Sequence, residues 1–346
     1  MSTFKKIMPI GGGGVVNTEN FAPVTYTGNS ASGRSITGVG FQPDLIWNKQ
    51  RNGTTGHNLT DSVRGVTKSV ASHNTNAEFT QSYYTSFDSD GWTFNNTGIN
   101  TSGETFVSWC FKAGGTAVSN TDGTITSQVS ANQDAGFSIV KYTGNGVSNA
   151  TIGHGLSSAP EFVIIKSTSN AHNWFSYHKD SRIGQSGNPE DGYMLLNTTS
   201  NDNPANSPLM FNSVAPSSTV LNLASYTEVN GSSKQFISYC FHSVSGYQKV
   251  GSYTGNTSGV TVTTGFKPRF LMIKRTDSTG NWFIYDSVRS GGDTFDDFLH
   301  PNLSAAETTN DSTYEFNATS TGFNVVGTGD GQTNSSGGTH IYLAIA

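Results

Sequence analysis

The chain has 346 residues, enough for two or three domains, and only 12% of them are charged. Its 19 Lys and Arg are outnumbered by 24 Asp and Glu, with no basic run longer than Lys5-Lys6, which argues against nucleic-acid binding. No apolar stretch is long enough for membrane insertion, and the 21 Phe, 13 Tyr and 5 Trp exclude a disordered chain.

The polarity of the chain comes from uncharged side chains, because Ser, Thr and Asn make up about a third of it and there are 40 Gly. Such residues suit turns and the solvent faces of strands and are weak in helix interiors. The apolar runs alternate with a period of two or are continuous over three or four residues, as in strands. We therefore predict an all-β fold with long polar loops and no long helix.

A tandem repeat is visible along the chain. The tetrapeptide Tyr-Thr-Gly-Asn begins at Tyr26, Tyr142 and Tyr253, which are 116 and 111 residues apart. A proline follows each copy at Pro43, Pro160 and Pro268, and further positions recur at fixed offsets from it. The sixth residue after each proline is a lysine: Lys49, Lys166 and Lys274. The fourteenth residue is His57, Trp174 or Trp282, and the eighteenth is Asp61, His178 or Asp286. Fixed offsets of this kind indicate duplication of one structural unit.

In chain order, the pattern predicts an N-terminal arm, three β units and one connector. The arm spans residues 1–23 and contains Gly11 to Gly14; the first unit spans 24–113, the connector 114–136, the second unit 137–245 and the third 246–346. Several short strands per unit with frequent turns favour a β-sandwich of jelly-roll or lectin-like type over a propeller or a β-helix.

Within each unit we predict an opening strand, a buried strand, a hairpin and a closing strand. The opening strands lie at 137–142 and 248–253, and the continuous apolar runs 161–166 and 269–274 indicate strands buried on both faces. The seven mostly polar residues between the lysine and the aromatic position predict a hairpin loop, with the next strand starting near Trp174 and Trp282. The closing strands lie at 105–112, 235–242 and 340–346. Short helical turns are allowed at 69–77 and 301–307.

Catalytic and metal chemistry have weak support in the residues. Two carboxylates facing a cleft would serve a glycan hydrolase, with Asp61, Asp286, the Asp88–Asp90 pair and the Asp296–Asp297 pair as candidates. Recurrence of Asp61 and Asp286 at one repeat position favours a scaffold role, and Asp88-Ser-Asp-Gly91 is typical of a turn. We predict no catalytic residue, no metal site and no cofactor. Cys110 and Cys240 occupy equivalent places, so we interpret them as buried apolar side chains rather than a disulfide.

Glycan binding is the more serious ligand hypothesis, because sugars are held by aromatic faces together with amides and hydroxyls. The loop aromatics proposed for this role are Tyr83, Tyr84 and Trp92. Trp174 and Trp282 sit at a repeated strand position and are predicted to be core residues.

Several longer segments resemble a family of tandem-repeat virion and tail-fibre proteins of marine tailed phages. They are Gly40-Phe-Gln-Pro-Asp-Leu-Ile-Trp-Asn-Lys49, Asp61-Ser-Val-Arg-Gly65, Ser86-Phe-Asp-Ser-Asp-Gly-Trp92, Trp109-Cys-Phe-Lys-Ala-Gly114 and Gly136-Phe-Ser-Ile-Val-Lys-Tyr-Thr-Gly144. The resemblance covers nearly the whole chain after residue 23, and it carries no catalytic motif with it.

This resemblance implies a non-enzymatic virion structural protein, most simply a tail fibre or tail-associated protein that contacts host surface glycans. The alternatives are a capsid decoration or head-fibre protein and a polysaccharide-degrading tailspike enzyme. The expected partners are other virion proteins of the tail or capsid and further copies of the chain in a symmetric homo-oligomer such as a trimer. With no signal-peptide core at the N-terminus, the protein is expected to be made in the host cytoplasm and released by lysis.

Overall fold

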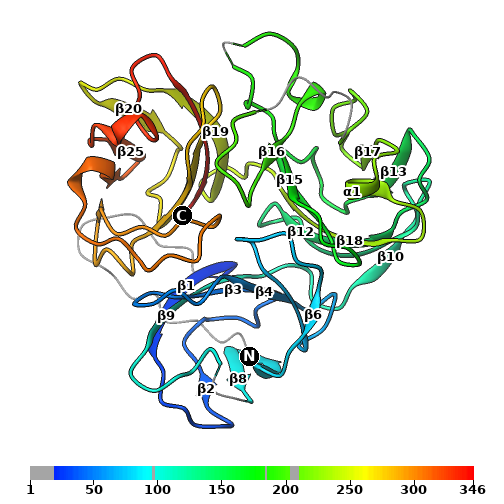
Figure 1. Cartoon of the computed structure of the whole chain (residues 1–346), viewed down its shortest axis with the longest axis horizontal. Helices are drawn as coiled ribbons and strands as arrows, with labels where there is room; N and C mark the ends of the chain where they lie inside the picture. The colour runs from blue at the N-terminus through cyan, green and yellow to red at the C-terminus, as the bar shows by residue number, and fades with distance from the viewer. Residues whose placement is uncertain (1–18, 96–97, 184, 203–209) are drawn as a thin grey trace, which may run out of the picture.

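The computed structural model describes residues 19–95, 98–183, 185–202 and 210–346. Figure 1 shows three lobes around a common centre: lobe 1 (19–113), lobe 2 (114–245) and lobe 3 (246–346). Of the predicted N-terminal arm (1–23), residues 1–18 lie outside the described residues. The all-β prediction is confirmed, because the described chain is built from antiparallel sheets and very short helices.

Lobe 1 contains a six-stranded sheet of order β1-β9-β3-β4-β5-β6 and a three-stranded sheet of order β2-β8-β7. Its strands are β1 (Phe21–Thr27), β2 (Ser35–Ile36), β3 (Leu45–Gln50), β4 (Asn58–Asp61), β5 (Lys68–Val70), β6 (Phe79–Thr80), β7 (Tyr84–Asp88), β8 (Gly91–Phe94) and β9 (Thr105–Phe111). Strand β1 begins at Phe21, three residues before the predicted start of the first unit.

Lobe 2 contains a seven-stranded sheet of order β10-β11-β12-β18-β14-β15-β16 and the pair β13-β17. Its elements are β10 (Val118–Asn120), β11 (Ser127–Asn132), β12 (Phe137–Thr143), β13 (Ala150–Gly153), β14 (Phe162–Ser167), β15 (Trp174–His178), η1 (Pro189–Asp191), β16 (Met194–Leu195), β17 (Val220–Leu223), α1 (Thr227–Asn230) and β18 (Gln235–Phe241). The predicted connector 114–136 supplies the hairpin β10–β11, whose second strand pairs with β12, so it extends the sheet of lobe 2.

Lobe 3 contains two four-stranded sheets, of order β19-β26-β21-β22 and β20-β25-β24-β23. Its elements are β19 (Gln248–Thr254), β20 (Val260–Thr263), β21 (Phe270–Arg275), β22 (Trp282–Asp286), β23 (Thr294–Phe295), η2 (Ser312–Tyr314), β24 (Phe316–Thr319), β25 (Gly322–Val325), η3 (Gly329–Gly331) and β26 (Thr339–Ile345). Residues 69–77 and 301–307, where short helical turns were allowed, contain no helix.

Four strands have the same order in all three lobes: β1-β9-β3-β4, β12-β18-β14-β15 and β19-β26-β21-β22. The register is also the same, because the tetrapeptide tyrosine faces the second residue of the closing strand each time, in the pairs Tyr26–Phe106, Tyr142–Phe236 and Tyr253–His340. The hairpins predicted after the buried lysines are present, and β15 and β22 start at Trp174 and Trp282.

The sheets that contain these four shared strands face one another across the centre, while the sheets β2-β8-β7, β13-β17 and β20-β25-β24-β23 lie on the outside (Figure 1). One apolar cluster runs through the centre and includes Phe111 of lobe 1, Phe241 of lobe 2 and Phe270 of lobe 3. Phe111 contacts Phe241 at 6.1 Å and Phe270 at 6.3 Å between ring centroids. Lobes 1 and 2 also have cores of their own between their two sheets. The three lobes therefore share a central hydrophobic core and are not independent domains.

The repeated tetrapeptide fastens the opening strand to the loop before the closing strand. The hydroxyls of Tyr26, Tyr142 and Tyr253 donate to the main-chain oxygens of Ile99, Val229 and Thr333 at 2.7, 2.6 and 2.6 Å. The motif's asparagine NH groups bond to the side-chain oxygens of Asn100, Asn230 and Asn334. These three asparagines are fully buried and lie five residues before each closing strand, an alignment that the sequence contains but that the repeat motifs did not reveal.

Candidate functional site

The aromatics expected to bind a ligand are mostly core residues. Tyr84 lies in β7 and is 2% exposed, and Trp92 lies in β8 and is fully buried, so the expectation that they are loop aromatics is wrong. Both belong to the lobe 1 core, where Trp92 contacts Phe94 and Tyr26 edge-on. Tyr83 is partly buried against the same core. These rings are therefore held by packing, and Tyr84 and Trp92 present no face to a sugar.

The first recurring carboxylate, Asp61, lies at the seam between lobes 1 and 2. Its side chain is fully buried and receives the Tyr239 hydroxyl of lobe 2 at 2.9 Å and the Arg64 Nε at 2.7 Å. The Arg64 guanidinium also donates to the Tyr239 hydroxyl at 3.3 Å, and Asp61 keeps the pKa of that guanidinium high despite its burial. The carboxylate is thus saturated with hydrogen bonds, and its role is to join two lobes.

The second recurring carboxylate, Asp286, repeats this arrangement at the seam between lobes 1 and 3. It receives the Trp109 indole NH of lobe 1 at 2.8 Å and the Arg289 Nε at 2.5 Å. Arg289 also bonds to Glu307 at 2.6 Å, and Glu307 in turn pairs with Arg51 of lobe 1 at 2.7 Å. Asp286, Arg289, Glu307 and Arg51 therefore form a network of alternating charges that joins lobes 1 and 3, which are not consecutive in the chain.

The seam between lobes 2 and 3 differs from the other two. The position equivalent to Asp61 and Asp286 is His178, and the position equivalent to Trp109 and Tyr239 is Leu343. Leucine offers no donor, and the neutral His178 donates instead from Nε2 to the main-chain oxygen of Tyr342 at 3.3 Å. Burial lowers the pKa of His178 to about 3, which keeps it uncharged. The two changes compensate each other, because a buried aspartate without this donor would be poorly satisfied.

A gap that is too narrow for a water molecule lies at this seam. It is lined by Phe162, His178, Met272, Trp282, Ile341, Tyr342 and Leu343.

A second ring of hydrogen bonds crosses the same three seams. The side chains at the fourteenth position after each proline, His57, Trp174 and Trp282, donate to the main-chain oxygens of His300, Ala71 and Leu195, each in a neighbouring lobe. The donor–acceptor distances are 3.0, 2.9 and 3.0 Å. The prediction that Trp174 and Trp282 are core residues is confirmed.

The three repeated lysines are fully buried at the ends of β3, β14 and β21. Each ammonium donates to the oxygen of its own hairpin loop, at Gly53, His172 or Gly280. Lys166 and Lys274 also donate to Thr75 and Thr199 of the neighbouring lobe. Burial lowers the pKa of Lys49 and Lys166 to about 8 and that of Lys274 to about 7.

The remaining candidates have structural contacts. Asp90 accepts from the main-chain NH groups of Gly38 and Gly40, and Asp88 accepts from the Thr93 hydroxyl. Asp297 accepts from the Asn310 NH. Cys110 and Cys240 are unpaired and buried, as predicted. Among the residues that the structure describes, no group of three His, Cys, Asp or Glu is placed to hold a metal ion.

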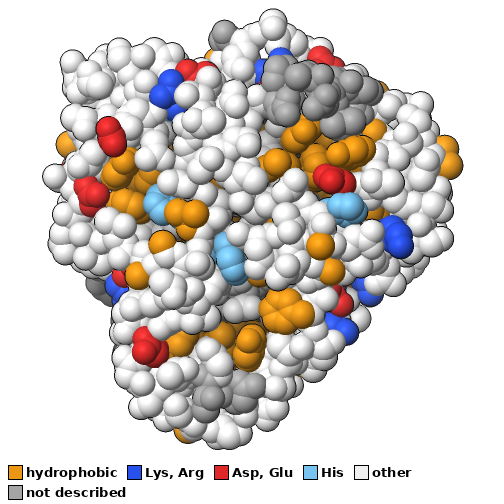
Figure 2. All heavy atoms as spheres, in the orientation of Figure 1, with side chains coloured by type: hydrophobic (Ala, Val, Ile, Leu, Met, Phe, Trp, Pro, Cys, Tyr) orange, Lys and Arg blue, Asp and Glu red, His pale blue; other side chains and the backbone are white. Residues whose placement is uncertain are grey.

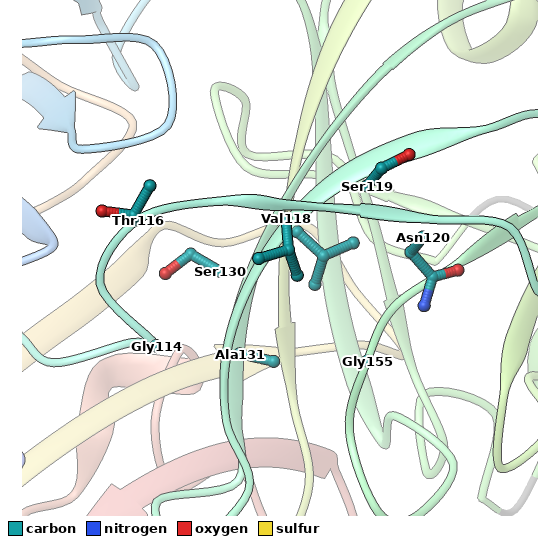
Figure 3. A pocket seen from close by; sticks show the side chains of 9 residues that line it. Gly114, Thr116, Val118, Ser119, Asn120, Ser130, Ala131 and Gly155 are labelled. Atoms are coloured by element: carbon teal, nitrogen blue, oxygen red, sulfur yellow. The ribbon is translucent and has the colours of Figure 1, made fainter.

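A groove of about 270 Å³ lies beside the edge strand β10 (Figure 3). Val118, which is 65% exposed, and Asn120 point to one side of β10, and Ser119 points to the other (Figure 3). The groove is lined by Gly114, Thr116, Val118, Ser119, Asn120, Val129, Ser130, Ala131 and Gly155. It holds no charged or aromatic side chain, so it offers little to orient a substrate.

Comparison with known proteins gives a family but no activity. A family model described as a domain of unknown function (DUF7483) matches residues 17–346. No curated protein matches the chain. In the described residues, no helix has the length and apolar character needed to cross a membrane.

Proposed function

The chain belongs to the DUF7483 family, and we propose that it is a non-enzymatic structural protein of a phage virion, a tail fibre or tail-associated protein. The observation that carries this proposal is the use of its buried polar groups. The recurring Asp, Arg, Trp, Tyr and His side chains form hydrogen bonds that join the three lobes into one body. A virion part needs such fixed geometry, and the segments that resemble phage virion proteins include Asp61 and Trp109 of these seams.

The outer surface fits a particle component as well. Figure 2 shows a face on which charged side chains are sparse and most of the surface is backbone or side chains that are neither charged nor hydrophobic. Such a surface limits long-range electrostatic attraction to the wrong partners while remaining hydrated. The partners in this proposal are neighbouring virion proteins, further copies of the chain, and glycans of the host surface.

The proposal is tested by purifying phage particles through a density gradient and probing each fraction with antibodies against the full chain. The expected result is a signal that follows the infectious particles and resists a salt wash. A signal confined to soluble lysate would contradict it.

The same preparation separates the alternatives. Separated tails and heads should divide the signal in favour of tails; recovery with heads would support the capsid decoration alternative. Incubation of the pure chain with host envelope polysaccharide should release no oligosaccharide, and release would support the tailspike enzyme.

A further inference from the structure

Two tyrosines that the repeat pattern does not predict lie together on the surface of lobe 2. Tyr193 and Tyr226 are partly exposed, and both rings rest on the buried Phe175 of β15, at 4.8 and 5.8 Å between centroids. Burial raises the pKa of Tyr226, and the nearby Glu228 carboxylate and Tyr193 raise it further. We call Tyr193 and Tyr226 the tyrosine platform.

Polar side chains border the tyrosine platform. Glu228 follows Tyr226 in α1 and faces the imidazole of His172 at 3.4 Å, and both side chains are about one-fifth exposed. Asn173 and Asn197, bonded to each other at 2.9 Å, are partly exposed in the adjoining loops. Over α1, Figure 2 shows apolar side chains around an acidic and a histidine side chain. Aromatic surface, a carboxylate, an imidazole and amides are thus within one small area.

Lobe 3 offers a comparison at the equivalent place. Phe283 of β22 corresponds to Phe175, and Tyr314, Phe298 and His300 cover it at 5.1, 5.2 and 4.6 Å between ring centroids. The Tyr314 hydroxyl accepts a hydrogen bond from Gln332. In lobe 3 this position is therefore covered by one tyrosine, a phenylalanine and a histidine, whereas in lobe 2 two tyrosines lie on Phe175 beside the Glu228–His172 contact. The two tyrosines of lobe 2 lie in segments where the lobes differ from one another.

We propose that the tyrosine platform binds a neutral hexopyranose residue of a polysaccharide. One face of such a ring carries axial C–H groups that pack on aromatic rings, and its rim carries hydroxyls. Glu228 accepts hydrogen bonds from those hydroxyls, and His172 and the two asparagines donate or accept them. An acidic sugar is disfavoured, because Glu228 and the neighbouring Glu190 and Asp191 of η1 repel it.

This site rests on the proposed contact with host surfaces, and its test does not use the particle. Saturation-transfer NMR is recorded on the full chain with the methyl pyranosides of glucose, galactose, mannose and N-acetylglucosamine, and with methyl glucuronide as the acidic probe. We expect transfer to the C–H protons of at least one neutral probe and little to the glucuronide. Tyr226→Ala and Tyr193→Ala should each weaken binding about five- to tenfold.

Two further variants guard against a trivial loss. Tyr226→Phe keeps the aromatic ring and should retain the saturation-transfer signal, so it tests the proposal even if Tyr226→Ala folds poorly. Tyr314→Ala removes the corresponding tyrosine of lobe 3 at a similar cost in stability and should leave binding unchanged. Absence of transfer to all four neutral probes, or transfer that survives both alanine substitutions, overturns the proposal. The chain would still be a virion protein if the gradient experiment places it on particles.

Discussion

Replacing His340 by phenylalanine should stabilise the protein. The His340 ring stacks on Tyr253, with 4.8 Å between ring centroids and 9° between ring planes. At the equivalent place in the other lobes, Phe106 stacks on Tyr26 and Phe236 stacks on Tyr142, each at 5.1 Å between centroids. Its side chain is fully buried, and neither ring nitrogen has a hydrogen-bond partner apart from a weak polar contact with the Gly338 backbone. The other two lobes show that this position accepts phenylalanine.

The size of the effect follows from two contributions. Buried polar atoms without partners cost about 1–3 kcal/mol, which the substitution removes near neutral pH. Burial also lowers the pKa of His340 to about 4 from 6.5. Between pH 6.5 and 4 the imidazole of residue 340 is therefore protonated in the unfolded chain but not in the folded chain. As pH falls through this range, His340 lowers the free energy of unfolding of the wild type by about 3 kcal/mol. The advantage of His340→Phe should grow over the same pH range.

Urea unfolding at about pH 7.5 and about pH 5, followed by tryptophan fluorescence, measures both contributions. The reverse change Phe236→His is the matched control and should destabilise, more strongly at the lower pH. A His340→Phe protein that is less stable than wild type, or whose advantage is the same at both pH values, would refute this reasoning.

Three further outcomes are expected. Asp61→Ala should cost about 3–5 kcal/mol, because it leaves the buried Arg64 and the Tyr239 hydroxyl without their shared acceptor; a calorimetric midpoint close to wild type would contradict this role. Gly322→Ala should destabilise by about 2 kcal/mol or more, since its methyl group would lie 1.9 Å from a main-chain oxygen, whereas Gly292→Ala meets nothing within 4 Å and should be nearly neutral in the same assay. Light scattering should give a multiple of the 36.7 kDa chain mass if the protein forms the proposed homo-oligomer, and a single-chain mass at high concentration would argue against it.

The sequence was sufficient to predict the buried strands and hairpins that recur in the lobes. Continuous apolar runs bounded by proline and by a polar loop specify a buried strand and its hairpin, so the start of β15 at Trp174 could be read directly. The assignment of Trp92 to a ligand-binding loop was wrong: Asp90-Gly91 marks a turn that leads into an aromatic strand, but the sequence does not show that Trp92 faces the core from that strand.

The seams could not be predicted, because they depend on contacts between residues far apart in the chain. Trp109 and Asp286 are 177 residues apart, and periodicity carries no information on which lobe faces which. A partial signal was present: Asp61 and Asp286 recur, whereas lobe 2 has His178, and the closing strands change from Trp109 and Tyr239 to Leu343. Only the structure shows that these two exceptions meet at one seam. The tyrosine platform was missed for a related reason, since its members belong to loops without a counterpart in the repeat.

At the repeated positions, the seam between lobes 1 and 3 has more charged groups than the seam between lobes 2 and 3. Lobes 2 and 3 are joined by the short segment 242–247, and their seam has a single His178 bond at the repeated position. Lobes 1 and 3 are not joined directly, and their seam has the four-charge network of Arg51, Glu307, Arg289 and Asp286. The linked seam between lobes 1 and 2 also has a buried ion pair, Asp61–Arg64, so connectivity alone does not set the charge of a seam.

The most direct test of the proposed function is a cryo-electron microscopy map of the purified particle. The account predicts three-lobed density on the tail that fits the chain as one body, with the seam side chains resolved between lobes. A complete map of the tail and head in which every protein density is explained by other chains would contradict it.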